Sequence, residues 1–239
     1  QFVIEGAGGH ASAPPPHTGI GRLARAVTRI EGNPFPRKLT KPVAEMFDTL
    51  GRRSSFLYRV IFANLWCFLP LLDALCKKTG GELNAMMRTT CAFTMAEGSK
   101  ASNVLPPRAR MVANLRVING STCEETLAAL KDRLDDKGIQ ASIVQGMDPS
   151  RVSETKGYGW DKLTSAIAQT WPEALISPYL MVACSDSRHY CAISDYVYRF
   201  SAMELSKQER GCIHGHDERI PVDKIVTTVQ FYVRLMRSL

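Results

Sequence analysis

The order of predicted elements over the first 147 residues constrains the fold more than any other feature of the sequence. Apolar alternation predicts four strands, over residues 1–7, 87–96, 109–118 and 139–144. Helical periodicity places one helix after the first strand and one after the third. This is the order of the split βαβ or ferredoxin-like arrangement. We therefore expect an α+β domain in which helices cover one face of a sheet.

Capping signals mark the start of both helices. Thr18 is a predicted N-cap, and apolar residues repeat with helical period from Ile20 to Ile30. Ser121 and Glu124 have the spacing of a capping box at the start of the second helix. One face of that helix is then lined by Leu127, Leu130 and Leu134.

A helical insertion, about residues 34–85, interrupts this order. Its apolar periodicity predicts three short helices, near residues 43–50, 56–66 and 69–77. The run 56–72 is the most apolar of the chain, but Arg59, Asn64 and Pro70 interrupt it. We expect a buried or interface helix there and no membrane span. The insertion is expected to pack as ordinary core, with a partner subunit or a substrate tunnel as alternatives.

A polar segment over residues 147–159, containing Pro149 and two glycines, predicts a domain boundary near residue 150. Beyond it we expect a helix over 160–170, strands over 179–184 and 197–203, and a final helix over 221–237. These strands are too few for a complete α/β domain. The predicted fold class is α/β, with an α+β domain over 1–150 and an incomplete α/β piece over 151–239.

Charge and cysteine content narrow the classes of function. The net charge of +7 suits a basic surface or anionic substrates. A dense Lys/Arg block, or basic residues interleaved with aromatic ones, would favour a nucleic-acid binder, and the sequence has neither. The seven cysteines have irregular spacing, which favours reduced thiols over a disulfide framework. The chain opens at Gln1 as if in mid-strand, so we expect the true N-terminus to be missing and leave the localisation open.

The residues from Cys212 to Ile220 are the richest in chemistry, with two histidines, two carboxylates and an arginine. They follow a predicted strand and precede a predicted helix, where sites often lie in α/β domains. Imidazole suits zinc, and His214 is the predicted ligand. The alternative is a solvated loop, which is the commoner context of a single His-Gly-His.

Two further features have a functional and an ordinary interpretation. Gly8 and Gly9 let the backbone turn and present His10, although an ordinary glycine-rich turn would look the same. Arg110 and Arg116 lie on one side of a predicted strand. That side is either a solvent face or a face that binds carboxylates.

Four stretches taken together resemble the zinc-dependent peptidase family M20. They occur in the family's order and are Gly8–Ser12, Ser102–Pro106, Ser185–Tyr190 and Ile213–Ile220. The insertion, with Ile61–Trp66 and Met87–Thr90, is most similar to the carboxypeptidase S branch, which includes N-acyl amino acid hydrolases. Each motif alone is weak, but the ordered set extends over nearly the whole chain.

The resemblance implies a catalytic α/β domain that holds two zinc ions and carries an inserted ferredoxin-like lid. Such lids often mediate dimerisation, so a homodimer through the lid is one implied assembly. Residues 1–150 would be the lid, with its helical insertion, and residues 151–239 the C-terminal portion of the catalytic domain. The boundary deduced from the polar segment agrees with the point where a lid returns to the catalytic domain.

The resemblance also implies roles for single residues. His214 resembles the last zinc ligand, and His10 resembles the lid histidine that polarises the scissile carbonyl in a partner's active site. Ser185 and Glu218 rank last among the candidate site residues. Predicted substrate contacts are Asn103, Arg116, Ser185 and Arg188.

The family's other zinc ligands and its catalytic base precede the lid. This chain therefore offers at most one zinc ligand and is expected to be inactive alone, unless Asp186, His189 and His216 are further ligands. The parent is expected to cleave, and also to form, amide bonds of peptides or N-acyl amino acids with a free carboxylate. One alternative is a non-catalytic dimerisation or regulatory module. The other alternative is a nucleic-acid binder, but the sequence has no RNP-like aromatic pair on a strand.

Overall fold

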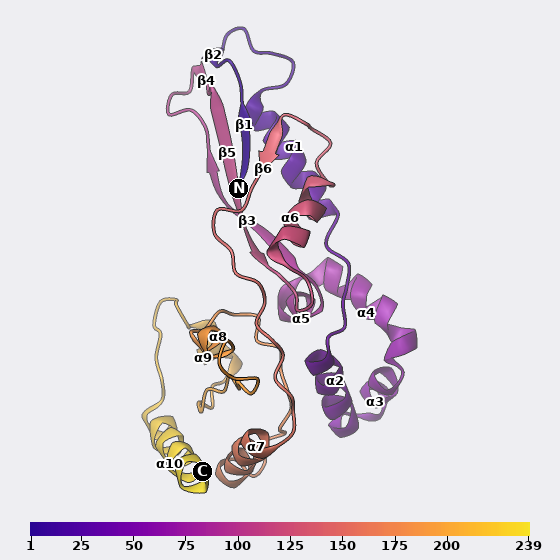
Figure 1. The fold of residues 1–239 in the computed structure, drawn as a ribbon, viewed down its shortest axis with the longest axis vertical. Helices are drawn as coiled ribbons and strands as arrows, with labels where there is room; N and C mark the ends of the chain where they lie inside the picture. Colours follow the sequence, from indigo (N-terminus) through magenta and orange to yellow (C-terminus); the bar gives the residue numbers. More distant parts are fainter.

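A four-stranded antiparallel sheet organises the N-terminal region, residues 1–150, of the computed structural model, which describes residues 1–239 (Figure 1). The strand order is β3-β5-β1-β6, and every neighbouring pair is antiparallel. The strands are β1 (Phe2–Glu5), β3 (Thr90–Glu97), β5 (Arg108–Arg116) and β6 (Ile139–Ala141). The first strand of the chain thus pairs with the third and fourth, which confirms the ferredoxin-like topology.

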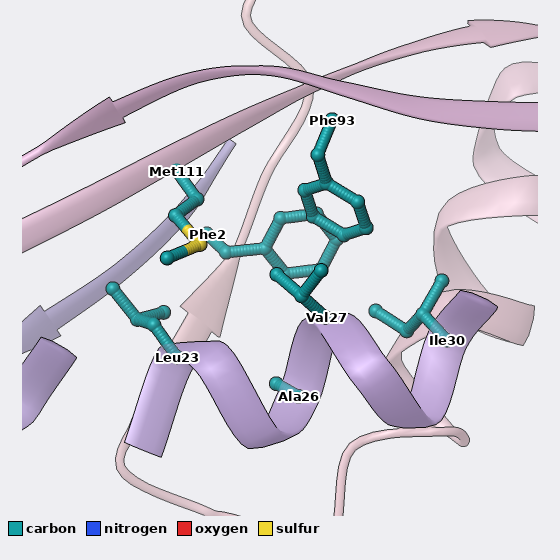
Figure 2. Close-up of a pocket in the computed structure, with 7 residues that line it drawn as sticks. All are labelled: Phe2, Leu23, Ala26, Val27, Ile30, Phe93 and Met111. Atoms are coloured by element: carbon teal, nitrogen blue, oxygen red, sulfur yellow. The ribbon is translucent and has the colours of Figure 1, made fainter. Parts of the chain in front are cut away.

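The helices α1 (Gly19–Gly32) and α6 (Cys123–Lys131) contribute to one core with the sheet. Leu23, Ala26 and Ile30 recur at helical spacing on α1 and are buried. Figure 2 shows them facing Phe2 of β1, with Phe93 of β3 and Met111 of β5 in the same layer. The core cluster comprises Phe2, Ile4, Leu23, Ala26, Ile30, Phe35, Ala109, Leu130, Ile139 and Ala141.

The capping predictions for these helices are half right. The hydroxyl of Thr18 accepts the backbone N–H of Gly21 at 3.2 Å, which confirms the predicted N-cap of α1. At α6, the capping box is formed by Thr122 and Glu125, one residue later than the predicted pair. Both pairs have the required spacing. Leu130 is buried on the inner face of α6. The helix ends at Lys131, so Leu134 lies beyond it.

A short ribbon extends the sheet region beyond the ends of β1 and β5. It consists of β2 (Gly9–His10) and β4 (Val104–Leu105), paired antiparallel. Gly8 has φ +67°, and a Cβ there would lie 3.2 Å from the carbonyl oxygen of Leu105. Both the positive φ and the close carbonyl oxygen therefore disfavour any residue other than glycine at this position. Figure 1 shows the ribbon at the end of the molecule opposite α7 and α10.

The insertion forms four helices where three were predicted. They are α2 (Lys41–Arg53), α3 (Phe56–Ala63), α4 (Leu65–Thr79) and α5 (Gly81–Met87). The predicted helix over 56–66 breaks at Asn64, and the one over 69–77 is part of the longer α4, which accommodates Pro70. The insertion has its own core, formed by Val43, Met46, Phe47, Cys76, Met86 and Met87.

A buried ion pair fastens the insertion to the sheet. Asp73 of α4 is 5% exposed and pairs with Arg88, which is 1% exposed and precedes β3. Arg88 also donates to the carbonyl oxygen of Phe35 at 2.8 Å and to Asn84 Oδ1 at 2.8 Å. Burial alone would raise the pKa of the Asp73 carboxyl, but hydrogen bonds from Arg88 and Lys77 outweigh it and hold that pKa below its usual value.

The C-terminal region, residues 151–239, is helical in the structure. Its helices are α7 (Tyr158–Thr170), α8 (Ser187–Tyr190), α9 (Lys207–Gly211) and α10 (Val222–Ser238). The longest two pack together around Ala166, Ile167, Ala202 and Phe231. The helix predictions for 160–170 and 221–237 are confirmed.

The strands predicted over 179–184 and 197–203 are wrong, because both segments are irregular. A strand requires a neighbour that accepts and donates backbone hydrogen bonds. The backbone here finds side chains instead: Val197 N–H donates to Ser153 Oγ at 2.8 Å. The side-chain hydroxyl of Tyr198 holds the same segment to a second residue, since it donates to the backbone carbonyl oxygen of Glu154 at 2.7 Å.

All seven cysteines are free thiols in the structure. Burial, followed by the nearby charge of Glu31, raises the pKa of the Cys91 thiol to about 11. This thiol is therefore protonated and unreactive at neutral pH.

Candidate active-site residues

His10 lies on the distal ribbon with its ring exposed to solvent. The Nδ1 atom is 2.7 Å from Ser12 Oγ and accepts the backbone N–H of Ser12 at 3.2 Å. A backbone N–H is always a donor, so Nδ1 of the neutral ring is the acceptor and the proton is on Nε2. His10 therefore presents an N–H donor, held in orientation, to the outside of the ribbon.

Asn103 is brought next to His10 by the same ribbon. The N–H of Ala11 donates to the carbonyl oxygen of Asn103 at 2.9 Å. His10 is also opposite Val104 in the register of the ribbon, immediately after Asn103. Backbone pairing thus brings together two predicted lid residues that are 93 positions apart in the chain.

Arg116 lies at the other end of the sheet. It is the last residue of β5, opposite Thr90 of β3, and is exposed. The strand begins at Arg108, on the side of the ribbon. Eight residue steps at about 3.3 Å each put the two ends of β5 roughly 26 Å apart. One small substrate therefore does not reach His10 and Arg116 of the same chain.

Ser185 and Arg188 are brought together in the turn that starts α8. The N–H of Arg188 donates to the carbonyl oxygen of Ser185 at 3.1 Å. The guanidinium Nη1 of Arg188 lies 3.1 Å from Cys184 Sγ. Arg199, which sequence reasoning did not single out, donates through Nε to Ser187 Oγ at 2.7 Å and fixes the same turn. Two guanidinium groups therefore flank a short polar helix.

His214 lies in an exposed loop between α9 and α10. The prediction that this loop follows a strand is wrong, because α9 precedes it. His214 has φ +61° and Asp217 has φ +59°, which is the left-handed backbone conformation that residues other than glycine rarely adopt. Two such residues in four positions give the loop its tight turn.

The zinc chemistry can be compared with the donors that are present. The structure contains no group of three or more His, Cys, Asp or Glu side chains arranged to hold a metal ion. His216, His189, Asp186 and Glu218 therefore do not complete a site around His214. One imidazole is a suitable zinc ligand, but a stable zinc site needs three or four ligands. The residues of this chain do not by themselves fit a zinc ion.

A contact between the two regions was missed by sequence reasoning. The hydroxyl of Tyr179 donates to Glu82 of α5, and Arg210 Nη2 lies 3.4 Å from the same carboxylate. Burial, and then the hydrogen bond to Glu82, raises the pKa of the Tyr179 hydroxyl. Leu180 and Val182 pack against the core of the insertion next to it. No local pattern links positions that are 97 residues apart.

The fold and the ribbon place this chain in a known class of proteins. Residues 1–142 match the family model described as the peptidase dimerisation domain of M20 peptidases. The matched residues carry the sheet, the ribbon and the helical insertion, and they are more than half of the chain. The chain therefore belongs to the M20 peptidase family, which consists of metallopeptidases and related hydrolases and generally uses zinc.

Two relatives show which branch of the family is most similar. The chain is 33% identical over 232 residues to the probable carboxypeptidase S-like 2 of Dictyostelium discoideum, covering 97% of this chain and 44% of that protein. It is 34% identical over 232 residues to the N-fatty-acyl-amino acid synthase/hydrolase PM20D1 of Xenopus tropicalis, covering 96% of this chain and 45% of that protein. The chain thus spans less than half of the length of these relatives.

A solved structure has the same fold. The M20 family metallo-carboxypeptidase Sso-CP2 from Sulfolobus solfataricus superposes with a TM-score of 0.61 at 14% identity. The alignment covers 99% of this chain and 56% of that one. At this identity the likeness concerns the fold, and it confirms the mixed α/β class expected from the sequence.

Proposed function

We propose that the chain is the lid domain and the C-terminal portion of the catalytic domain of a dinuclear zinc amidohydrolase. The parent cleaves the amide bond of peptides or N-acyl amino acids that carry a free carboxylate. The lid comprises residues 1–150 and the catalytic portion residues 151–239. The observation that carries the proposal is the orientation of His10, whose Nε2–H donor is held by Ser12 beside Asn103.

His10 is the donor that stabilises the oxyanion. When an amide is attacked, negative charge develops on the carbonyl oxygen, and a preorganised N–H donor lowers the energy of that state. The neutral ring of His10 needs no proton transfer to play this role, because Nε2 already carries the proton. The ribbon holds the backbone of Asn103 beside that of His10, so the Asn103 amide is the second donor that we assign to the substrate.

The ribbon acts in the active site of a partner protomer. Figure 1 shows the ribbon at the opposite end of the molecule from α10, the helix that follows the His214 loop. A two-fold dimer through the lid would bring each ribbon to the other protomer's catalytic portion. Arg116, at the near end of β5, and Arg188 then remain with their own chain. Either guanidinium can bind the free carboxylate of the substrate in bidentate fashion.

His214 supplies one zinc ligand, and the remaining ligands come from residues outside this chain. The chain alone is therefore inactive. Ser185 contributes a hydroxyl beside Arg188 in the turn that faces the substrate. The alternative, a non-catalytic dimerisation module, keeps the ribbon and the sheet but needs neither His10 nor His214.

The proposal is tested in the complete enzyme with His10→Ala and the matched control His17→Ala. Both histidines are exposed and lie in the same segment. Loss of one oxyanion donor is expected to lower kcat by about 10²–10³-fold. The control should retain activity on N-acyl amino acids or dipeptides. Equal activity of the two variants would contradict the role of His10, and a complete enzyme with no metal-dependent amidohydrolase activity would contradict the function.

A further inference from the structure

Helix α3 and residues 65–72 of α4 in the insertion are apolar on all sides, apart from Arg59. Every residue of α3 except Arg59 is apolar or aromatic, yet none of them is buried. Their inner side already packs against the core of the insertion through Phe62, Leu65 and Leu69. A helix that is apolar all round is normally covered all round, by protein or by lipid. The outer side of these helices therefore calls for a partner.

The two helices expose six large apolar side chains, which together we call the α3–α4 face. They are Phe56 (80% exposed), Leu57 (67%), Tyr58 (57%), Trp66 (82%), Leu71 (69%) and Leu75 (55%). Figure 1 shows both helices at the outer edge of the molecule, away from the ribbon and from α7–α10. Large apolar side chains gathered in this number on exposed helices mark sites of interaction.

Positive charge surrounds this face. Between residues 50 and 80 the exposed charged residues are all cations: Arg52, Arg53, Arg59, Lys77 and Lys78. Arg52 pairs with Asp48, just outside this range, at 2.9 Å. The only acidic residue within the range is Asp73, which is buried and pairs with Arg88 and with Lys77, so Arg53, Arg59 and Lys78 are the cations without an ion pair. The face therefore suits an anionic partner.

We propose that the α3–α4 face docks on the surface of an anionic phospholipid bilayer, with its aromatic side chains inserted among the headgroups. Trp, Tyr and Phe next to Lys and Arg are typical of helices that lie in the membrane interface. The cations bind lipid phosphates and carboxylates, while the apolar side chains reach the acyl boundary.

The geometry of the two helices fits docking and not spanning. No single helix is long and apolar enough to cross a membrane, and α3 and α4 meet that criterion only together, with a bend of 103° between them. Helices of 8 and 15 residues are about 12 and 22 Å long, short of a hydrocarbon core of roughly 30 Å. A bent pair of this length lies along a surface.

Charge also argues against a second copy of the chain as the occupant. A two-fold contact through the α3–α4 face would place the same cations of two protomers against each other. Like charges at an interface cost free energy unless acidic residues separate them. The exposed acidic residue next to these cations, Asp48, already pairs with Arg52, which leaves none to separate Arg53, Arg59 and Lys78 of the two copies.

The test uses the chain of residues 1–239 and vesicles of phosphatidylcholine, with and without about a third phosphatidylserine. We expect binding that requires phosphatidylserine, weakens at high salt and shifts the tryptophan emission to shorter wavelength, and this shift should be absent when Trp66 is replaced. Phe56→Ser with Trp66→Ser should lower the partition coefficient at least tenfold. Arg53→Ser with Lys78→Ser should weaken binding in the same direction and reduce its salt dependence.

The matched control is Val222→Ser with Val226→Ser on α10, where both side chains are also exposed, at 77% and 56%. This variant should bind as the unchanged chain does. A second variant of the face, Tyr58→Ser with Leu75→Ser, guards against misfolding of the first, and circular dichroism checks the fold of each.

Three results would overturn the proposal. One is the absence of vesicle binding, and another is binding that the Phe56 and Trp66 substitutions leave unchanged. The third is a dimer of the unchanged chain that the same substitutions convert to a monomer, since the face would then be covered by a second copy.

Discussion

The N-terminal and C-terminal regions differ in how much of their apolar surface they bury themselves. The sheet and its two helices enclose ten buried apolar residues, whereas the C-terminal region encloses four. The C-terminal helix α10 leaves Val222, Val226 and Met236 more than half exposed. The four-stranded sheet pairs the backbone groups of neighbouring strands, and its two helices cover the apolar side chains of one face. A helix pair with isolated irregular segments does neither, so its stability depends more on what covers it.

The largest expected effect concerns the buried ion pair that joins the insertion to the sheet. Arg88→Met leaves the Asp73 carboxylate buried with only the half-exposed Arg37 and Lys77 as partners. We expect a loss of about 3–5 kcal/mol in the free energy of unfolding, because a buried charge without its main partner is strongly destabilising. Urea denaturation measures it. Arg108→Ala, which breaks an exposed pair with Glu5, should cost no more than about 1 kcal/mol.

A core substitution in each region tests whether the two unfold independently. Leu23→Ala, at a side chain 1% exposed, should cost about 3 kcal/mol in the N-terminal region. In a Trp66→Phe background, the fluorescence of Trp160 and Trp171 reports on the C-terminal region alone. Its unfolding midpoint should move with Ile167→Ala and stay unchanged with Leu23→Ala. A common shift for both variants would show one cooperative unit and erase the contrast.

A smaller effect is expected where α2 and α3 approach each other. A Cβ on Gly51 would lie 2.6 Å from Cβ of Phe62, so Gly51→Ala forces the two helices apart. Overpacking of this kind costs about 1–3 kcal/mol. Gly32→Ala is the control, because nothing lies within 4 Å of its added Cβ. Thermal denaturation should separate the two, and an equal Tm would contradict the close packing of the insertion.

The smallest effect is a dependence of stability on acid pH in the N-terminal region. Arg22 donates to Asp136 from Nε at 2.6 Å, and this pairing lowers the pKa of the carboxyl to about 2. A carboxyl whose pKa is lower in the folded state stabilises it above the unfolded pKa of about 4. That stability, on the order of 1 kcal/mol for this partly exposed pair, is lost as pH falls from about 4 to 2.

Arg22→Ala should remove this part of the pH dependence and leave the rest of the curve unchanged. Arg29→Ala is the matched control, since Arg29 pairs with Asp135 on the surface at 2.6 Å, with both side chains more than half exposed. An identical acid limb for the unchanged chain and the Arg22 variant would contradict the assigned role of the pair.

The sequence predicted the N-terminal fold well because every strand there finds a partner within the region. In the sheet and its two helices, apolar alternation and the caps agree with the tertiary structure, apart from the capping box of α6, which shifts by one residue. The insertion differs more, with four helices where three were predicted. The same alternation over 179–184 and 197–203 gave wrong predictions, since neither segment meets another strand. Periodicity shows that a strand can form, whereas pairing decides whether it does.

The candidate site was predictable only in part. The proximity of His10 and Asn103 follows from a ribbon of two-residue strands, which are too short to show any periodicity. The distance between Arg116 and the ribbon follows from the length of β5. The sequence predicted that strand, but it did not predict which residues of other elements lie at either end. The Tyr179–Glu82 contact joins elements far apart in the chain, and no motif marks it. The roles of the site residues stay predictions.

The central claim is that each active site combines the ribbon of one protomer with the catalytic portion of the other. It is tested most directly by mixing two inactive variants of the complete enzyme, His10→Ala and His214→Ala. A mixed dimer would contain one site with both native histidines, so random mixing should restore roughly a quarter of the unchanged activity. No recovery on mixing, with mixed dimers shown to form, would contradict the shared site.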